Sequence, residues 1–389
     1  MYSLNASISA AIIIFPMIAF IITIPYLIWH YHKYGSVLLL RAVILYSFIL
    51  YLLCAFFLVI LPLPSIEEVA RLHKPSMQLI PFQFVSDIEM YTEFSVWTPS
   101  TYWDSFFNGA FLQVVFNILM FIPFGIYLRY YYQKNFLECF LLSLSLSLFF
   151  EITQLTGLYG IYPRAYRLFD VDDLMLNTVG GLLGFIIEPV LVFLLPTKDK
   201  LNELSYEKGM KVTTFRRMMG TGIDWFFIFT VLFLIEYFTK QIKIINIMLL
   251  ASWKDAVIYF AIIMLYFMVL PYLLGGYTLG KRIVNIKVVN KKMKKPVFIQ
   301  YFVRYGILYG IFIPVIPYIY QILILLENNR NTINTYIGFG LIAVLLIGSI
   351  FFGLFAFLSF FTNGKLFLYE KLSSTSVISV IQAFEERER

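Results

Sequence analysis

Polar side chains that could bind a ligand or carry protons recur inside three long apolar stretches of this sequence. The pairs are Gln113 with Asn117, Glu151 with Gln154, and Asp173 with Asn177. Spacings of three or four residues put both members of a pair on one helix face. An ionised side chain at the centre of a bilayer costs about 2.5–3.5 kcal/mol. We therefore expect these polar faces to meet a partner, a cavity or the membrane interface.

Charged residues gather in the short segment between the second and third of these stretches. Arg164 and Arg167 are followed by Asp170, Asp172 and Asp173. One interpretation is that these ions pair with each other and cap two helices, because Asp is favoured at a helix N-terminus. The other is an outward-facing polar pocket. Clustered carboxylates can also hold a divalent cation, but no His joins them and the arginines compete for them, so we predict no metal site.

Residue types for catalysis, redox chemistry or nucleotide binding are poorly placed in this sequence. It holds no Ser-His-Asp arrangement and no zinc spacing, and His73 is interpreted as a loop residue. Cys54 and Cys139 lie inside apolar runs, unlike disulfide partners. The segment 275–281 matches G-x-x-x-x-G-K, but Arg282 stands where Ser or Thr must bind magnesium. We predict a non-enzymatic protein without a cofactor.

The elements that position these residues are membrane helices. Hydrophobic residues make up 60% of the 389 residues and charged residues 14%, against about 45–50% and about 25% in soluble domains. Apolar stretches of about 20 residues, long enough to cross a bilayer as helices, lie near 8–29, 38–61, 110–128, 136–158, 173–195, 219–239, 255–274, 304–326 and 335–361. We predict an all-α integral membrane protein with about nine transmembrane helices.

Loop charges predict the orientation of these helices. Basic residues follow the first stretch: His30, His32, Lys33 and Arg41. Acidic residues dominate the loop after the second: Glu67, Glu68, Asp87, Glu89, Glu93 and Asp104. The segment 275–303 is again basic. The positive-inside rule then places the N-terminus outside and the C-terminus in the cytoplasm, with Lys240, Lys243 and Lys254 as the exception.

The net charge of +7 has the same origin, because the Lys and Arg residues lie in the loops between apolar runs. We therefore predict membrane lipids as partners and no nucleic acid. The lysines of 291–295 fit an anionic inner leaflet, where each contributes about 1 kcal/mol.

Several spaced blocks in the first half resemble the VanZ-like family, in the family's order. The blocks are 79–82 (LIPF), 117–125 (NILMFIPFG), 151–154 (EITQ), Arg164, and 170–184 (DVDDLMLNTVGGLLG). The resemblance implies a short multi-helix membrane domain, and the founding member confers low-level resistance to the glycopeptide teicoplanin. The functional positions it implies are Asn117, Pro123, Gly125, Glu151, Gln154, Arg164, Asp170, Asp172, Asp173 and Asn177.

The second half carries a different set of polar residues. Arg216 and Arg217 precede Asp224 in an apolar stretch, where the arginines are expected to snorkel and Asp224 to pair with Arg304. Alternation over 277–290 predicts a short strand. This half resembles the RDD family over 216–310, although Leu279 replaces a Pro and Asn290 an Asp on which cation/proton exchange would depend. We predict a second polar site of Arg217, Asp224, Lys281 and Arg304.

The predicted organisation places two membrane domains in series. It consists of an extra N-terminal transmembrane helix (1–37), a VanZ-like domain (38–196) with an external loop (62–109), a cytoplasmic linker (197–215), an RDD-like domain (216–362) and a cytoplasmic tail (363–389).

The predicted function is that of a VanZ-like protein in the plasma membrane of a Gram-positive bacterium. Its outward polar pocket would engage a cell-wall precursor, a lipid or an amphiphile such as a lipophilic glycopeptide, and so lower susceptibility to teicoplanin-like drugs. The alternative is a transporter coupled to cations or protons, in which Asp224, Glu236 and Glu151 carry the charge.

Overall fold

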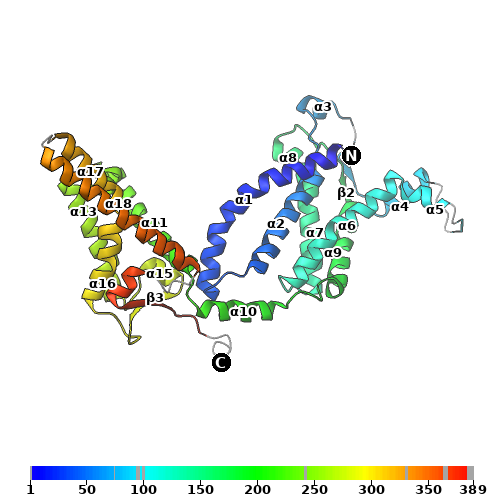
Figure 1. Ribbon diagram of the computed structural model, residues 1–389. Helices are drawn as coiled ribbons and strands as arrows, with labels where there is room; N and C mark the ends of the chain where they lie inside the picture. The colour runs from blue at the N-terminus through cyan, green and yellow to red at the C-terminus, as the bar shows by residue number, and fades with distance from the viewer. Residues whose placement is uncertain are drawn as a thin grey trace. The chain divides into compact units, whose positions relative to one another are not determined.

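The computed structural model describes residues 2–73, 75–92, 97–98, 101–240, 243–328, 332–361 and 367–382. Regular structure in this part is helical apart from four short strands (Figure 1). The chain divides into two compact units, which we call unit 1 and unit 2. Unit 1 comprises Met1–Thr23 and Leu38–Leu201, and unit 2 comprises Ile24–Val37 and Asn202–Arg389.

Long apolar helices dominate both units. Among the described residues, eight helices are long and apolar enough to cross a membrane. A ninth crossing is present if the bent pair Phe298–Ile311 and Val315–Glu327, which meet at 52°, is one span. The prediction of a helical, multi-pass membrane protein is confirmed. Of the loop acids used to predict orientation, Glu93 lies outside the described residues.

Unit 1 is built from membrane helices joined by shorter elements (Figure 1). The long helices are α1 (Tyr2–Tyr34, continuing into unit 2), α2 (Leu39–Ile60), α6 (Gly109–Tyr130), α7 (Phe136–Leu155) and α9 (Val171–Leu191). The short elements are α3 (Ile66–Ala70), α4 (Gln83–Tyr91), α5 (Tyr102–Phe106), α8 (Gly157–Gly160), β1 (Met77–Gln78) and β2 (Phe169–Asp170). Strands β1 and β2 pair in parallel. Helix α10 (Lys198–Met210) starts in unit 1 and continues into unit 2.

Small residues bring α6 and α9 into close contact. A methyl group added to Gly180 would overlap the carbonyl oxygen of Ile118, and one added to Gly184 would overlap that of Ile122. A methyl group on Gly125 would likewise overlap the carbonyl oxygen of Gly181. The predicted close helix approach through Gly180-x-x-x-Gly184 is therefore confirmed.

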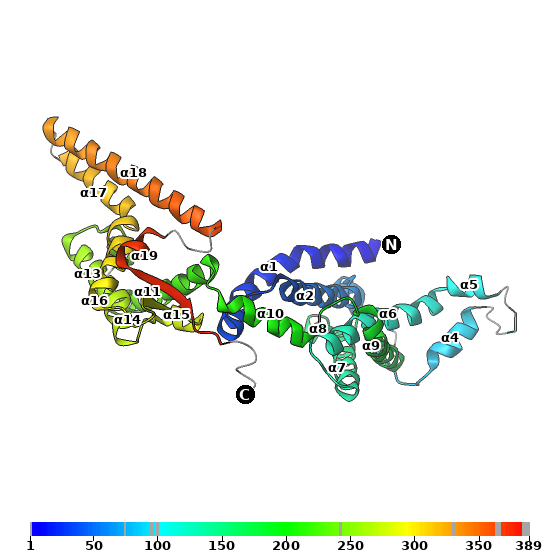
Figure 2. The ribbon, with the colours of Figure 1, turned by 60° about the horizontal axis from the view of Figure 1, so that its bottom comes forward.

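Unit 2 packs its helices around an aromatic core. Its elements are α11 (Thr214–Thr239), α12 (Ile244–Leu249), α13 (Trp253–Ile263), η2 (Met264–Val269), α14 (Leu270–Leu273), α15 (Leu279–Ile283), β3 (Ile286–Asn290), α16 (Phe298–Tyr305), η3 (Gly306–Phe312), α17 (Val315–Asn328), α18 (Thr332–Phe361), α19 (Leu368–Ser373) and β4 (Thr375–Ser379). The rings of Phe267 and Tyr309 stack at 4.2 Å between centroids. Helices α17 and α18 lie side by side (Figure 2).

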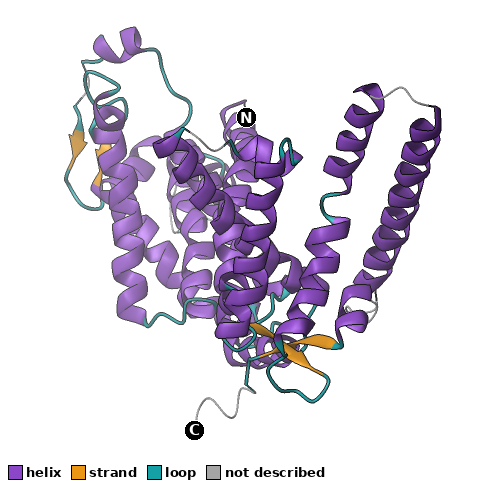
Figure 3. Cartoon of the chain, turned by 90° about the vertical axis from the view of Figure 1, so that its left-hand side faces the viewer, coloured by secondary structure: helices purple, strands orange, loops and turns teal. Residues whose placement is uncertain are grey.

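Only the second half of the segment 277–290, for which a strand was predicted, forms a strand. Thr278 caps a short helix, α15, by accepting a hydrogen bond from the main-chain nitrogen of Lys281, so the segment 279–283 is helical. Strand β3 follows and pairs antiparallel with β4, which comes from the segment predicted as a tail (Figure 3). The pairing joins Ile286 to Ser379 and Asn290 to Thr375. The tail residues 363–366 and 383–389 lie outside the described part.

Candidate functional site

Helices α6 and α9 meet at a short side-chain hydrogen bond in unit 1. The Asn117 Nδ2 atom donates to Asp173 Oδ1 at 2.5 Å. Asp173 lies in the first turn of α9, just after Asp170, whose side chain caps that helix by accepting from the Asp172 nitrogen at 2.8 Å. Two of the predicted pairs of polar residues therefore converge on the first turn of α9.

Helix α7 reaches the same place through Glu151, which is 2% exposed. The Glu151 Oε2 atom accepts a hydrogen bond of 2.9 Å from the main-chain nitrogen of Asp170. On the next turn, Gln154 Nε2 donates to the carbonyl oxygen of Val59 at 3.1 Å, which ties α7 to the end of α2. The buried carboxyl group of Glu151 thus positions β2 and the start of α9.

Asp172 and Asn177 have positioning roles of their own. Both carboxylate oxygens of Asp172 accept main-chain N–H groups, at 2.7 Å from Phe82 and 2.9 Å from Phe84. Phe82 has a left-handed φ of 66°, a conformation that costs energy for a non-glycine residue and so needs such support. Deeper between α7 and α9, Asn177 Nδ2 donates to Ser147 Oγ at 2.9 Å.

The two arginines of the connecting segment bind main-chain carbonyl groups. Arg164 Nη1 donates to the carbonyl oxygen of Leu72. Arg167 donates to the carbonyl oxygens of Val59 at 2.8 Å and Leu61 at 2.7 Å. These contacts hold the segment that follows α2 against the segment that precedes α9. The arginines therefore organise the loops around the acidic cluster.

Three cavities surround this cluster, and Asp173 lines all of them; we call them together the polar recess. Their volumes are about 770, 530 and 370 Å³. The largest is also lined by Arg164, Arg167 and Asp170. The second is lined by Glu151 and Asn177 together with apolar residues of α2 and α6. The smallest is lined by Asp87, Asp170 and Asp172.

The structure therefore brings the predicted residues of the first half to one recess. Each of them lines at least one of the three cavities: Asn117, Glu151, Gln154, Arg164, Asp170, Asp172, Asp173 and Asn177. Gln113, Arg167 and Asp87 also line the recess but were not among the predicted binding residues. The spacing of Gln113 from Asn117 is the signal that could have included it, whereas the position of Asp87 depends on the fold of α4.

Burial and neighbouring acids perturb Asp170, which precedes the membrane helix. Burial raises its pKa above the ordinary value, and the carboxylates of Asp172 and Asp87 raise it further, although the hydrogen bond from the Asp172 nitrogen opposes this.

Within the described residues, no three His, Cys, Asp or Glu side chains are grouped so that they could hold a metal ion.

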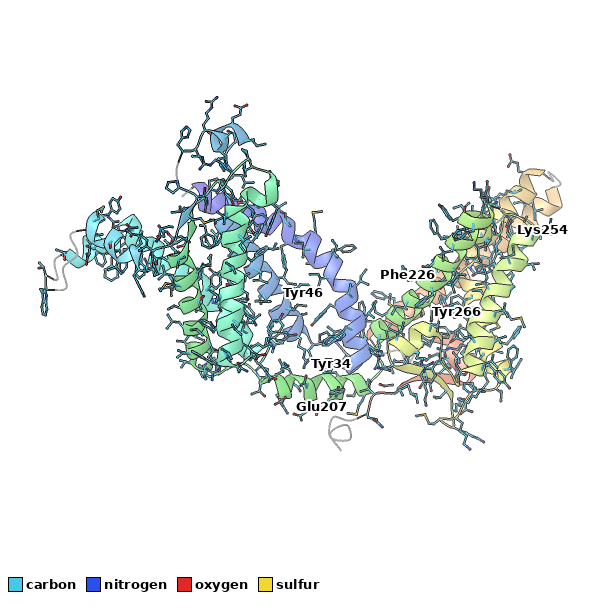
Figure 4. The ribbon with its side chains drawn as sticks, turned by 180° about the vertical axis from the view of Figure 1, so that it is seen from behind. Tyr34, Tyr46, Glu207, Phe226, Lys254 and Tyr266 are labelled. Atoms are coloured by element: carbon cyan, nitrogen blue, oxygen red, sulfur yellow. The ribbon has the colours of Figure 1, made fainter. Side chains whose placement is uncertain are left out.

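The polar residues of unit 2 form a different arrangement from the one predicted. Asp224 accepts hydrogen bonds from Tyr266 Oη at 2.8 Å, Thr278 Oγ1 at 2.6 Å and the Gly280 nitrogen at 2.6 Å. Lys281 Nζ lies 3.7 Å from Asp224 Oδ2. Tyr266, which is labelled in Figure 4, belongs to η2 and reaches across to Asp224 on α11. Asp224 and Lys281 thus meet as predicted for the second polar site.

The predicted pairing of Asp224 with Arg304 is wrong. Arg304 Nη2 donates to Glu370 Oε1 at 2.8 Å, and its Nη1 donates to Thr375 at 2.8 Å. Arg217 Nη1 lies 2.9 Å from the same Glu370 oxygen. The reason is that the segment 367–382 folds back onto α11 and α16 and supplies a closer carboxylate.

The expectation that Arg216 snorkels is also wrong. Its side chain is fully buried. It donates to the carbonyl oxygens of Gly209 at 2.6 Å, Val284 at 2.8 Å and Asn285 at 2.8 Å. Three main-chain acceptors satisfy the guanidinium inside the protein, so it has no need to reach the interface.

Comparisons with known proteins identify both halves. A family model described as VanZ/LLP1 matches residues 48–194, and a model of the RDD family matches residues 211–365. Protein VanZ of Enterococcus faecium is 38% identical over 78 residues, or 20% of this chain. The match covers 44% of that relative's own length. No solved structure matches the chain. The chain is therefore a multi-pass membrane protein that joins a VanZ-like domain to an RDD-family domain.

Proposed function

We propose that the VanZ-like domain lowers susceptibility to teicoplanin-like glycopeptides, without catalysis, by binding a ligand in the polar recess. The ligand would be a cell-wall precursor, a lipid or an amphiphilic drug, met at the outer face of a Gram-positive plasma membrane. The relation to Protein VanZ supports the biological role. Asp173 lines all three cavities, which supports the polar recess as the place where the ligand binds.

The lining of the recess fits an amphiphile. The cavity of about 530 Å³ combines Glu151 and Asp173 with apolar residues such as Phe116 and Leu119. Phe116 is 62% exposed and Leu119 51% exposed, which in a membrane helix means contact with lipid. A molecule with its polar head at Asp173 could therefore extend its apolar part along α6 into the bilayer, in keeping with pockets that combine an apolar wall with few polar groups.

Binding without chemistry agrees with the hydrogen bonds of the acidic cluster. Asp172 and Glu151 accept main-chain N–H groups and so position the walls of the recess. Asp173 accepts from the Asn117 amide, which cannot take up or release a proton at ordinary pH. These groups act as acceptors that orient a ligand.

The proposal includes nine crossings, with the N-terminus outside and the C-terminus in the cytoplasm. The antiparallel pairing of β3 with β4 supports this count. Paired strands lie on one side of the membrane, so the chain between them crosses it an even number of times. Helix α18 supplies one crossing, and the bent pair of 298–311 and 315–327 must then supply another. The recess would face outward, because it lies where α6 and α9 begin and α7 ends, next to the loop before α6 and the loop after α7.

A susceptibility test measures the proposed function directly. A susceptible Gram-positive host would be compared with and without this chain against teicoplanin and vancomycin, with membrane amounts checked by immunoblot. We expect the chain to raise the inhibitory concentration of teicoplanin, and the Asp173→Asn variant to give no increase. Equal protection by the wild-type chain and by Asp173→Asn would refute the recess as the binding site.

A second candidate is proton- or cation-coupled transport, and the burial of Glu151 favours it. This carboxyl group is 2% exposed and lies in a membrane helix beside a cavity, which is typical of proton-carrying residues. Proton and sodium flux in vesicles that contain the purified chain would distinguish the two. A flux that disappears in Glu151→Gln would favour transport over ligand binding.

A further inference from the structure

Three cationic side chains of unit 2 converge on one small cavity. They are Arg217 from α11, Lys281 from α15 and Arg304 from α16. Their side chains are 14%, 7% and 4% exposed. The cavity has a volume of about 30 Å³ and is also lined by the rings of Tyr305 and Tyr369. Such a concentration of buried positive charge needs compensation.

The carboxylates that face these cations do not balance them. Glu370 Oε1 is shared, at 2.9 Å from Arg217 and 2.8 Å from Arg304. Asp224 lies 3.7 Å from Lys281 and already accepts three hydrogen bonds from other groups. Three cations therefore face two carboxylates, which leaves one surplus positive charge among the described residues around this cavity. A buried charge of this kind is costly without a counter-ion.

Several donors in the wall of the cavity also lack acceptors. Arg217 Nε, Arg304 Nε and Tyr305 Oη are buried and have no hydrogen-bond partner within the described structure. Arg217 Nη1 lies 2.9 Å from Glu370 Oε1 but makes no hydrogen bond, so this contact is ionic alone. Tyr305 is 2% exposed. Unsatisfied buried donors of this number are rare in proteins, and each calls for an acceptor at the site.

The size of the cavity selects the class of ligand. A space of about 30 Å³ holds one or two waters, or one monatomic ion of similar size. It is too small for a phosphate or a lipid headgroup, and its surplus positive charge repels cations. We propose that this cavity binds a single halide ion, chloride in the cell, held by Arg217, Lys281, Arg304 and the hydroxyl group of Tyr305. The site is independent of the function proposed for the VanZ-like domain.

Halide-dependent stability of the purified full-length chain tests this proposal. Sodium chloride would replace sodium gluconate at constant ionic strength while the unfolding temperature is measured in detergent. A ligand that binds the native state alone raises this temperature in a saturable way. We expect chloride and bromide to raise it, and sulfate, which is too large, to leave it unchanged. No response to chloride, or an equal response to sulfate, would overturn the proposal.

Two variants and a control locate the site. Arg217→Gln removes the surplus charge, so we expect the chloride response to disappear. Tyr305→Phe removes one donor and keeps the ring. The chloride concentration that gives half of the maximal rise in unfolding temperature should therefore increase several-fold. Arg282→Gln changes the exposed neighbour of Lys281 and should respond like the wild type. If Arg217→Gln does not fold, Tyr305→Phe decides: an unchanged chloride response in that variant would overturn the proposal.

Discussion

The side-chain amide of Asn117 and the carboxylate of Asp173 form a hydrogen bond of 2.5 Å that joins α6 to α9 at the polar recess. Asp173 also lines every cavity of the recess. The bond is therefore both a link between two membrane helices and part of the proposed binding surface. Substitutions of Asn117 and Asp173 would test separately whether the bond links the two helices and whether it contributes to ligand binding.

We predict that Asp173→Asn, Glu151→Gln and Arg164→Lys each keep the chain in the membrane but lose glycopeptide protection. The first two replace a carboxyl group with an amide of almost the same shape, and Lys cannot replace the planar, multidentate donor set of Arg. Inhibitory concentrations and membrane amounts would be measured in parallel. Glu138→Gln, at the opposite end of α7, is the matched control, because Gln can replace Glu in the capping box that Glu138 forms with Asn135. Full protection by the three variants together would contradict the prediction.

Helix packing in unit 1 should depend sharply on Gly125. A methyl group there overlaps the main chain of α9 at Gly181, so Gly125→Ala should destabilise the fold by about 1–3 kcal/mol, as overpacked cores do. Gly109→Ala is the control on the same helix, because no atom lies within 4 Å of its added methyl group. Unfolding temperatures of the two variants in detergent measure the difference. Equal temperatures would mean that α6 and α9 are not in close contact.

The proposed orientation can be tested with single cysteines in a background where Cys54 and Cys139 are replaced. We expect Glu89→Cys and Arg164→Cys to react with an impermeant thiol reagent on intact cells, because both lie in loops proposed to be outside. Lys292→Cys, in the loop after β3, should react only after the cells have been lysed. The reverse pattern of labelling would place the polar recess in the cytoplasm.

Glu370 should be important for the stability of unit 2. It is the shared ionic partner of Arg217 and Arg304, and removing one member of a buried ionic group costs about 3–5 kcal/mol. Glu370→Gln should therefore lower the unfolding temperature strongly. Glu207→Gln, a change at an exposed acid of α10 (Figure 4), should have little effect. Similar unfolding temperatures for the two variants would show that the 367–382 segment does not stabilise unit 2.

The stability of the first domain should depend on pH through Asp170. Because burial and neighbouring carboxylates raise its pKa in the folded protein, the folded state binds a proton more tightly than the unfolded state. Its contribution to stability is then fully present below the ordinary Asp pKa and is lost as the pH rises through the raised value.

The Asp170→Asn variant should remove this dependence, since Asn also caps helices well. We expect the variant to match the wild type in acid and to unfold at a higher temperature near neutral pH. The unfolding temperature measured across this pH range tests it. A constant difference between variant and wild type at all pH values would contradict the prediction.

The sequence by itself determined the long membrane helices and many of the residues at the recess. Local properties were sufficient for this, because an apolar stretch of about 20 residues in lipid must be helical to satisfy its main chain. Helical spacing likewise put Glu151 with Gln154 and Asp173 with Asn177 on single faces. The Gly180-x-x-x-Gly184 spacing predicted close packing, which the contact of α9 with Ile118 and Ile122 confirms.

The tertiary structure decided which polar groups pair with each other. Arg304 has Glu370 as its partner, 66 residues further along the chain, and not Asp224. Asp172 binds the main chain of Phe82 and Phe84, about 90 residues before it. No helical or strand periodicity relates such distant positions, because their distance depends on how α15, β3 and β4 fold together and on how the loop after α2 returns to α9. Short-range spacing therefore predicts which face of a helix is polar, whereas long-range packing determines which group pairs with each polar side chain on that face.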